Sequence, residues 1–147
     1  MNSIPQVLLV DDNPADTDLA RDTLARSPWP SQVRALADGE QAMAVLYRLG
    51  KVAHEVSPDL VILDLNMSRK DGRAVLAEVR ADPFLGTTPV VVCSTSRAGL
   101  DVARSYELGA NSYVSKPGNL HHDFVSAVES ISAFWFGCAY LLRKEEK

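Results

Sequence analysis

The segment LVILDL, residues 60–65, is apolar at every position except Asp64. A strand with one face in water alternates apolar and polar side chains, so an unbroken apolar run indicates a strand buried on both faces. Such strands occupy the centre of parallel sheets that helices cover on both sides. We therefore expect residues 60–65 to form the central strand of an α/β domain.

Four further candidate strands and five candidate helices alternate around this segment. The strands are expected at residues 6–10, 32–36, 90–93 and 112–114, and the helices at about 14–27, 38–50, 73–81, 100–108 and 120–145. Asn13-Pro14 is typical of a helix start, and Gly50 and Gly109 can each end a helix. Parallel strands need crossover connections, which this alternation supplies. We therefore predict a flavodoxin-like, doubly wound α/β fold with a five-stranded parallel sheet.

The composition is that of one globular domain. The chain has 147 residues, 46% of them hydrophobic, and a formal net charge of −4. The negative charge argues against nucleic-acid binding, because phosphate backbones need a positive surface. Without a membrane span or a signal-peptide pattern, the protein is expected to be cytoplasmic. Cys93 and Cys138 are expected to be reduced core thiols. We expect a single domain over residues 1–147, with no output domain.

Acidic, hydroxyl and basic side chains follow four of the predicted strands. Asp11 and Asp12 follow the first, Asp64 ends the third, Ser94 follows the fourth, and Lys116 comes shortly after the fifth. In an open parallel sheet, functional residues gather at the carboxyl ends of the strands. Crowded carboxylates repel one another unless a cation relieves them, and oxygen ligands suit Mg²⁺. We therefore predict a Mg²⁺ site where Asp64 is a nucleophile and Lys116 holds a phosphoryl group.

Each of these residues has an ordinary structural explanation when it is taken alone. Asp12 could cap the following helix, Ser94 could be a satisfied hydroxyl, and Lys116 could be a surface lysine. Asp64 fits such an explanation less well, because a buried acid at the end of a central strand is costly unless it is paired. Residues 69–72 are expected to form a solvated turn beside the cleft. The functional interpretation depends on the joint arrival of these side chains at one edge.

Four motifs resemble the receiver domain of bacterial two-component response regulators over nearly the whole chain. They are LLVDDNPAD at 8–16, LVILDLNMSRKDG at 60–72, PVVVCSTS at 89–96 and GANSYVSKP at 109–117. The resemblance implies a phosphoacceptor that assists its own phosphorylation and dephosphorylation rather than an enzyme. Its phosphoryl donor would be the phosphohistidine of a sensor histidine kinase.

The resemblance also implies a role for each residue of the predicted cleft. Asp64 would be the phosphoacceptor, and Lys116 would contact the phosphate. Mg²⁺ would be bound by Asp12, Asp64 and the backbone carbonyl of Asn66, with Asp11 acting partly through water.

The same resemblance implies a two-state switch. The Ser94 hydroxyl would swing towards the aspartyl phosphate, and the Tyr113 ring would move inward into the space that opens. The fourth helix, the fifth strand and the fifth helix would form the surface that reports the change. The Lys116-Pro117 peptide bond would be cis, an arrangement that is common only before proline.

Access to the phosphoacceptor would involve Asn66, Thr95 and Ser96. The family commonly has Ala or Gly at the position of Thr95, so a bulkier side chain here predicts narrowed access and slow autodephosphorylation. The family also commonly has Pro at the position of Ser68, so the loop here is expected to be less rigid.

Three shorter motifs look like single-domain regulators that pair with bacterial phytochrome histidine kinases. They are DGRAVLAEVRADP at 71–83, STS at 94–96 and FWFG at 134–137. In that group the C-terminal helix joins a dimer interface. Phe134, Trp135 and Phe136 widen the apolar side of the last predicted helix, which indicates a second contact surface and a homodimer. The other explanation left open is a helix end that folds back onto its own core.

Three rival functions fit parts of the pattern. An aspartyl-phosphate phosphohydrolase would need an acid at the position of Asn66. A flavodoxin-like cofactor binder would need a loop rich in hydroxyls and glycine in place of residues 11–16. The third is a degenerate receiver that acts as a dimeric docking module without phosphorylation.

Overall fold

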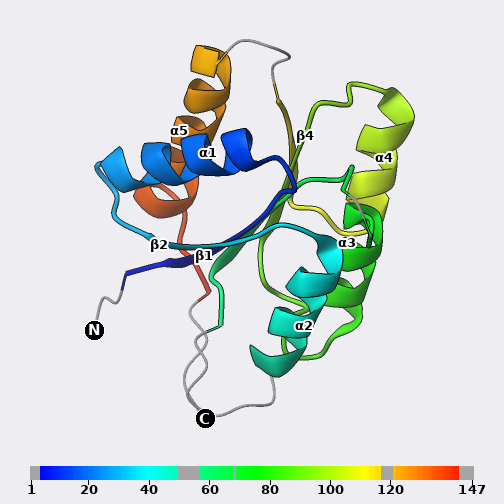
Figure 1. Cartoon of the computed structure of the whole chain (residues 1–147). Coiled ribbons are helices and arrows are strands. Elements are labelled where there is room, and N and C mark those ends of the chain that lie inside the picture. Colours follow the sequence, from blue (N-terminus) through cyan, green and yellow to red (C-terminus); the bar gives the residue numbers. More distant parts are fainter. Residues whose placement is uncertain (1–3, 50–56, 68, 117–120, 143–147) are drawn as a thin grey trace.

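The computed structural model describes residues 4–49, 57–67, 69–116 and 121–142 of the chain (Figure 1). In this part of the chain, one parallel sheet has the strand order β2-β1-β3-β4-β5, so the predicted α/β fold is confirmed. The strands are β1 (Gln6–Val10), β2 (Gln32–Leu36), β3 (Leu60–Leu63), β4 (Val90–Ser94) and β5 (Ser112–Ser115). The apolar segment that begins at Leu60 lies between β1 and β4, at the centre of the sheet, as predicted.

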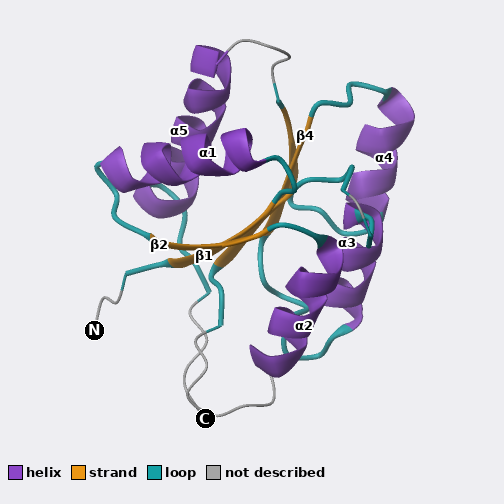
Figure 2. Ribbon diagram, viewed as in Figure 1, coloured by secondary structure: helices purple, strands orange, loops and turns teal. Residues whose placement is uncertain are grey.

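Helices cover both faces of the sheet (Figure 2). One face is covered by α1 (Pro14–Arg26) and α5 (His121–Gly137), and the other by α2 (Gly39–Leu49), α3 (Gly72–Ala81) and α4 (Gly99–Glu107). Short polar side chains start several of them. Asn13 accepts hydrogen bonds from the backbone N–H groups at the start of α1, and Asp71 does so for α3. These bonds satisfy donors that a helix start otherwise leaves without partners.

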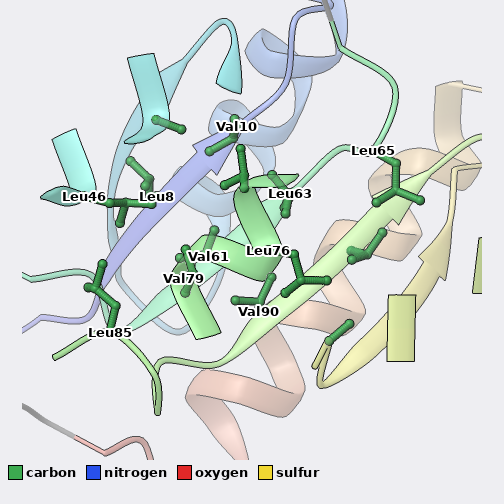
Figure 3. Close-up of a cluster of buried hydrophobic side chains, with 14 of the residues drawn as sticks. Leu8, Val10, Leu46, Val61, Leu63, Leu65, Leu76, Val79, Leu85 and Val90 are labelled. Atoms are coloured by element: carbon green, nitrogen blue, oxygen red, sulfur yellow. The ribbon is translucent and has the colours of Figure 1, made fainter. Parts of the chain in front are cut away.

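The sheet separates two apolar cores, because successive side chains of a strand point to opposite faces. The core beneath α2 and α3 contains Leu8, Val10, Val61 and Leu63 (Figure 3). The core beneath α1 and α5 contains alternate residues of the same strands and Cys93. Burial raises the pKa of the Cys93 thiol to about 12, which keeps it protonated, in agreement with a core thiol.

Three strand ends differ from the prediction. β3 ends at Leu63 rather than Leu65, because the carbonyl of Leu65 accepts a hydrogen bond from the backbone N–H of Gly72 at the start of α3 (2.9 Å). β4 extends to Ser94 rather than Cys93 and β5 to Ser115 rather than Val114, because these two residues pair with each other. These changes all affect the edge of the sheet where the predicted site residues lie.

The last helix is shorter than predicted. α5 ends at Gly137, and residues 138–142 are not helical, so the expected extension to about 145 is wrong. The backbone N–H groups of Cys138 and Ala139 both donate to the carbonyl of Phe134, which closes the last turn. Trp29 packs against Gly137, where a Cβ would come within 2.6 Å of the indole ring. Cys138 is therefore exposed and is not a core thiol.

Some predictions concern residues outside the described part of the chain. These are the helix end at Gly50, the loop at Ser68 and the cis bond before Pro117. Among the described residues, none of the helices is both long and apolar enough to cross a membrane.

Candidate functional site

Parallel pairing brings the predicted site residues to one edge of the sheet. Val10 is paired with Leu63, and Leu63 with Val92, so β1 and β3 end at the same level and β4 continues two residues farther, to Ser94. Ser94 and Ser115 are paired farther along the edge. Acidic, hydroxyl and basic groups that lie far apart in sequence are therefore close together in space.

Lys116 lies among the acids of this edge. Its side chain is 6% exposed, and Nζ lies 2.6 Å from Oδ2 of Asp11, 3.0 Å from Oδ2 of Asp16 and 3.6 Å from Oδ2 of Asp64. Burial by itself would lower the pKa of Lys116, but the hydrogen bond to Asp11 and the charges of Asp11 and Asp64 hold that pKa above its usual value. The ammonium group therefore stays charged near neutral pH.

The Asp64 carboxyl group lies at the end of the central strand and is buried. Burial raises its pKa to about 6, and the charge of Lys116 only partly opposes this shift. Its own backbone N–H donates to the carbonyl of Val10 (2.9 Å), and the backbone N–H of Asn66 bonds to the carboxylate. The backbone therefore fixes Asp64 in place, while its charge is only partly compensated.

Three acids can direct carboxylate oxygens to a common point. One oxygen each from Asp11, Asp12 and Asp64 lie within 4.8 Å of one another. Hard divalent cations take such oxygen ligands at distances of about 2.0–2.6 Å, so the arrangement fits one ion. Asp12 is not the cap of α1, because Asn13 has that role. The predicted carbonyl ligand, Asn66, is exposed two residues after Asp64.

Ser96 connects the two predicted switch residues. Its backbone N–H donates to Oγ of Ser94 (3.3 Å), and its carbonyl accepts from the Tyr113 hydroxyl (2.8 Å). Ser94 is fully buried, and Tyr113 is half-buried against the core next to α3. The Ser96 hydroxyl donates to Oδ2 of Asp101 (2.5 Å), whose Oδ1 accepts from Arg73 (2.7 Å). A chain of hydrogen bonds thus joins the end of β4 to α4 and α3.

Comparison with known proteins assigns this arrangement to a family. The model of the response regulator receiver domain matches residues 7–129. The chain belongs to the response regulator receiver domain family. It is similar to the response regulator Rcp1 of Synechocystis, with 43% identity over 129 residues that cover 88% of this chain and 87% of Rcp1.

Two solved structures of receiver proteins resemble this one closely. The phosphorylated cyanobacterial phytochrome response regulator RcpA has 42% identity and a TM-score of 0.88, covering 95% of this chain and 99% of RcpA. The Mn(2+)-bound form of Rcp1 has 40% identity and a TM-score of 0.87, covering 94% of this chain and 99% of Rcp1. The receiver fold is therefore shown for this chain, and its relative Rcp1 binds a divalent ion, Mn(2+).

The structure adds two residues that the sequence did not identify as part of the receiver site. Asp16, in the first turn of α1, accepts a hydrogen bond from Lys116. Gly72, predicted in a solvated turn, is buried, and a Cβ there would lie 2.1 Å from the carbonyl oxygen of Asp64. The sequence could have indicated Asp16, because it lies five residues after Asp11 in the same motif, LLVDDNPAD. Gly72 had no such signal, because its contact with the backbone of Asp64 and Leu65, just after β3, forms only on folding.

The three aromatic residues predicted at an interface have different environments. Phe134 is 54% exposed, and its ring makes an edge contact with Trp135 at 5.2 Å between centroids. Trp135 and Phe136 are half-buried and pack against the core beneath α1 and α5. The helix end thus folds partly onto its own core, and of these three rings only that of Phe134 is exposed.

Proposed function

We propose that Asp64 accepts a phosphoryl group from the phosphohistidine of a sensor histidine kinase in a Mg²⁺-dependent reaction. The main support is the buried Lys116 ammonium, 3.6 Å from the carboxylate of Asp64 and bonded to Asp11. A bound Mg²⁺ would supply positive charge and hold a phosphoryl oxygen. Asp11, Asp12 and Asp64, with the carbonyl of Asn66, would hold the ion. In this proposal the whole chain, residues 1–147, acts as one receiver domain.

The reaction follows from the positions of these side chains. An oxygen of Asp64 attacks phosphorus while the P–N bond to the imidazole of the kinase breaks, and the electron pair stays on the ring nitrogen. Lys116 neutralises charge on the phosphoryl oxygens, so most of the catalytic effect is positioning and electrostatics. The product is an acyl phosphate on Asp64. Its hydrolysis, which restores the carboxylate, depends on water that passes Asn66, Thr95 and Ser96.

The same chemistry explains how the proposed switch would operate. The Ser94 hydroxyl lies on the strand next to β3 and would turn towards the new phosphoryl oxygens. This movement would break its bond from the N–H of Ser96, whose carbonyl holds the Tyr113 hydroxyl. The Tyr113 ring would then move inward, and the surface of α4, β5 and α5 would change.

The intact mass of the protein tests this proposal. Incubation with acetyl phosphate and Mg²⁺ should add one phosphoryl group to the wild type and none to Asp64→Asn or to a sample with excess EDTA. Asp59→Asn is the matched control, because Asp59 is a buried acid just before the same strand. A wild type that gains no mass from acetyl phosphate or from a phosphorylated histidine kinase would contradict the proposal and favour a docking module.

We also propose that the partner kinase is a bacterial phytochrome, which places the protein in the cytoplasm with the kinase domain. The support is the similarity to Rcp1 and to RcpA, a phytochrome response regulator, over nearly the whole chain. Phosphoryl transfer from a phosphorylated phytochrome kinase should be much faster than transfer from an unrelated histidine kinase. Equal transfer from both kinases would contradict the pairing.

A homodimer through the C-terminal region completes the proposal. Phe134, Tyr140 and Leu142 are large apolar residues that are more than half exposed, and they lie within nine residues of one another in the chain. Exposed apolar patches usually mark an interface, and these side chains are the ones proposed to form it. Light scattering before and after phosphorylation would measure both the dimer and its dependence on the phosphoryl group.

A further inference from the structure

Asp16 contacts the site without belonging to the set of acids proposed to hold the metal. It lies in the first turn of α1, and its own backbone N–H donates to the capping side chain of Asn13 (3.2 Å). Its carboxylate accepts a hydrogen bond from Nζ of Lys116 at 3.0 Å, and its side chain is 29% exposed. A helix start that is itself capped therefore positions a further acid beside the lysine.

The hydrogen bonds of Lys116 are distributed unevenly. Its ammonium group donates to Asp11 at 2.6 Å and to Asp16 at 3.0 Å, whereas the nearest oxygen of Asp64 lies at 3.6 Å, beyond hydrogen-bonding distance. The ammonium group is thus bonded to the acids of the β1–α1 segment rather than to the phosphoacceptor. A phosphoryl group on Asp64 would need this lysine as its own donor.

We propose that Asp16 is a positioning residue that holds the Lys116 ammonium group towards α1 while Asp64 is unmodified. This inference rests on the proposed phosphorylation of Asp64. When a phosphoryl group arrives, Lys116 exchanges its bond to Asp16 for one to a phosphoryl oxygen, and the Asp16 carboxylate is left to solvent. Asp16 therefore opposes phosphoryl binding because it retains the lysine that the phosphoryl group needs.

The affinity for beryllofluoride, a phosphoryl mimic, tests the inference through ¹⁹F NMR titration at saturating Mg²⁺. Asp16→Asn should bind beryllofluoride about tenfold more tightly, because a hydrogen bond to a charged group is worth about 1.5 kcal/mol and each 1.4 kcal/mol is about tenfold. Asp16→Glu restores the charge and an acceptor and should bind as the wild type does. Asp18→Asn is the matched control, since it removes the same charge from an exposed position of α1.

Measuring the affinity for beryllofluoride at high salt distinguishes the loss of the bond between Asp16 and Lys116 from the mere loss of a negative charge. The gain in Asp16→Asn should persist at about 1 M salt, where the Debye length is about 3 Å and unpaired charges are screened. A gain that disappears in salt, or an affinity that is equal to or weaker than that of the wild type, would overturn the inference while leaving the proposed function intact. A wild type that neither binds beryllofluoride nor gains a phosphoryl group would overturn both.

Discussion

At the scale of single residues, the Asp64 carboxyl group links stability to pH. Its pKa is about 6 in the folded protein against 3.8 for an ordinary aspartate, so the folded state binds more protons between these values. This contribution to stability is therefore present at low pH and is lost as the pH rises through about 6. Burial of the charged carboxylate then destabilises the metal-free protein near neutral pH.

Asp64→Asn should remove this pH dependence. In EDTA, the variant should be more stable than the wild type by about 2 kcal/mol at pH 7, and this difference should shrink towards pH 4. Urea unfolding of both proteins at several pH values measures it. Mg²⁺ should reverse the order, because it stabilises the wild-type site by mass action more strongly at pH 7 than at pH 5. A wild type more stable than the variant at pH 7 in EDTA would contradict this account.

Thr95 is the residue with the clearest expected effect on the lifetime of the phosphoryl group. It is exposed directly after β4, next to the buried Ser94. Its side chain is expected to limit the approach of water to the acyl phosphate on Asp64, so Thr95→Ala should shorten the lifetime. The decay of ³²P-labelled protein in the two forms measures this effect. Equally fast decay in the wild type and the variant would rule out the barrier.

At the scale of elements, the bonds from Arg73 through Asp101 to Ser96 join α3, α4 and the loop after β4. The hydrogen bond from Ser96, and then the hydrogen bond from Arg73, lower the pKa of Asp101. Asp101 and Arg73 therefore both stay charged near neutral pH and form an ion pair. Because the Ser96 carbonyl also holds Tyr113, the ion pair supports the unswitched position of that ring.

Arg73→Gln should therefore loosen the loop after β4 without unfolding the domain. Amide hydrogen exchange should become several-fold faster in residues 95–102 and stay unchanged in α5, since local opening depends on local contacts. Arg26→Gln is the matched control, because Arg26 forms an exposed pair with Asp22 within α1. Unchanged amide exchange in residues 95–102, or faster amide exchange in every element, would show that the Arg73–Asp101 ion pair does not hold this loop in place.

At the scale of the whole molecule, the proposed dimer depends on the exposed apolar residues of the C-terminal region. Phe134→Ser should convert the proposed dimer into a monomer by light scattering, at little cost to folding, because the ring is 54% exposed. Tyr47→Ser is the matched control, since Tyr47 is an exposed aromatic residue on α2, on the opposite face of the sheet. A wild type that stays monomeric with and without phosphorylation, or a variant that still dimerises, would exclude this interface.

Sequence alone determined the alternation of strands and helices and the residues at the carboxyl ends of the strands. Both depend on local signals: the apolar run that begins at Leu60 and the acids and lysine that follow strands. Because parallel strands end at one edge, Asp11, Asp64 and Lys116 could be assigned to a single site before any contact was known. The family motifs added Tyr113 and the individual roles of the site residues.

Only the tertiary structure decided which segments contact one another in space. The bond from Lys116 to Asp16 joins residues 100 positions apart, and the close approach of Gly72 to Asp64 depends on how α3 packs against β3. The end of α5 at Gly137, beneath Trp29, has the same origin. Periodicity indicates which side of an element is apolar, but the partner of that side, and the place where a helix stops, depend on packing in three dimensions.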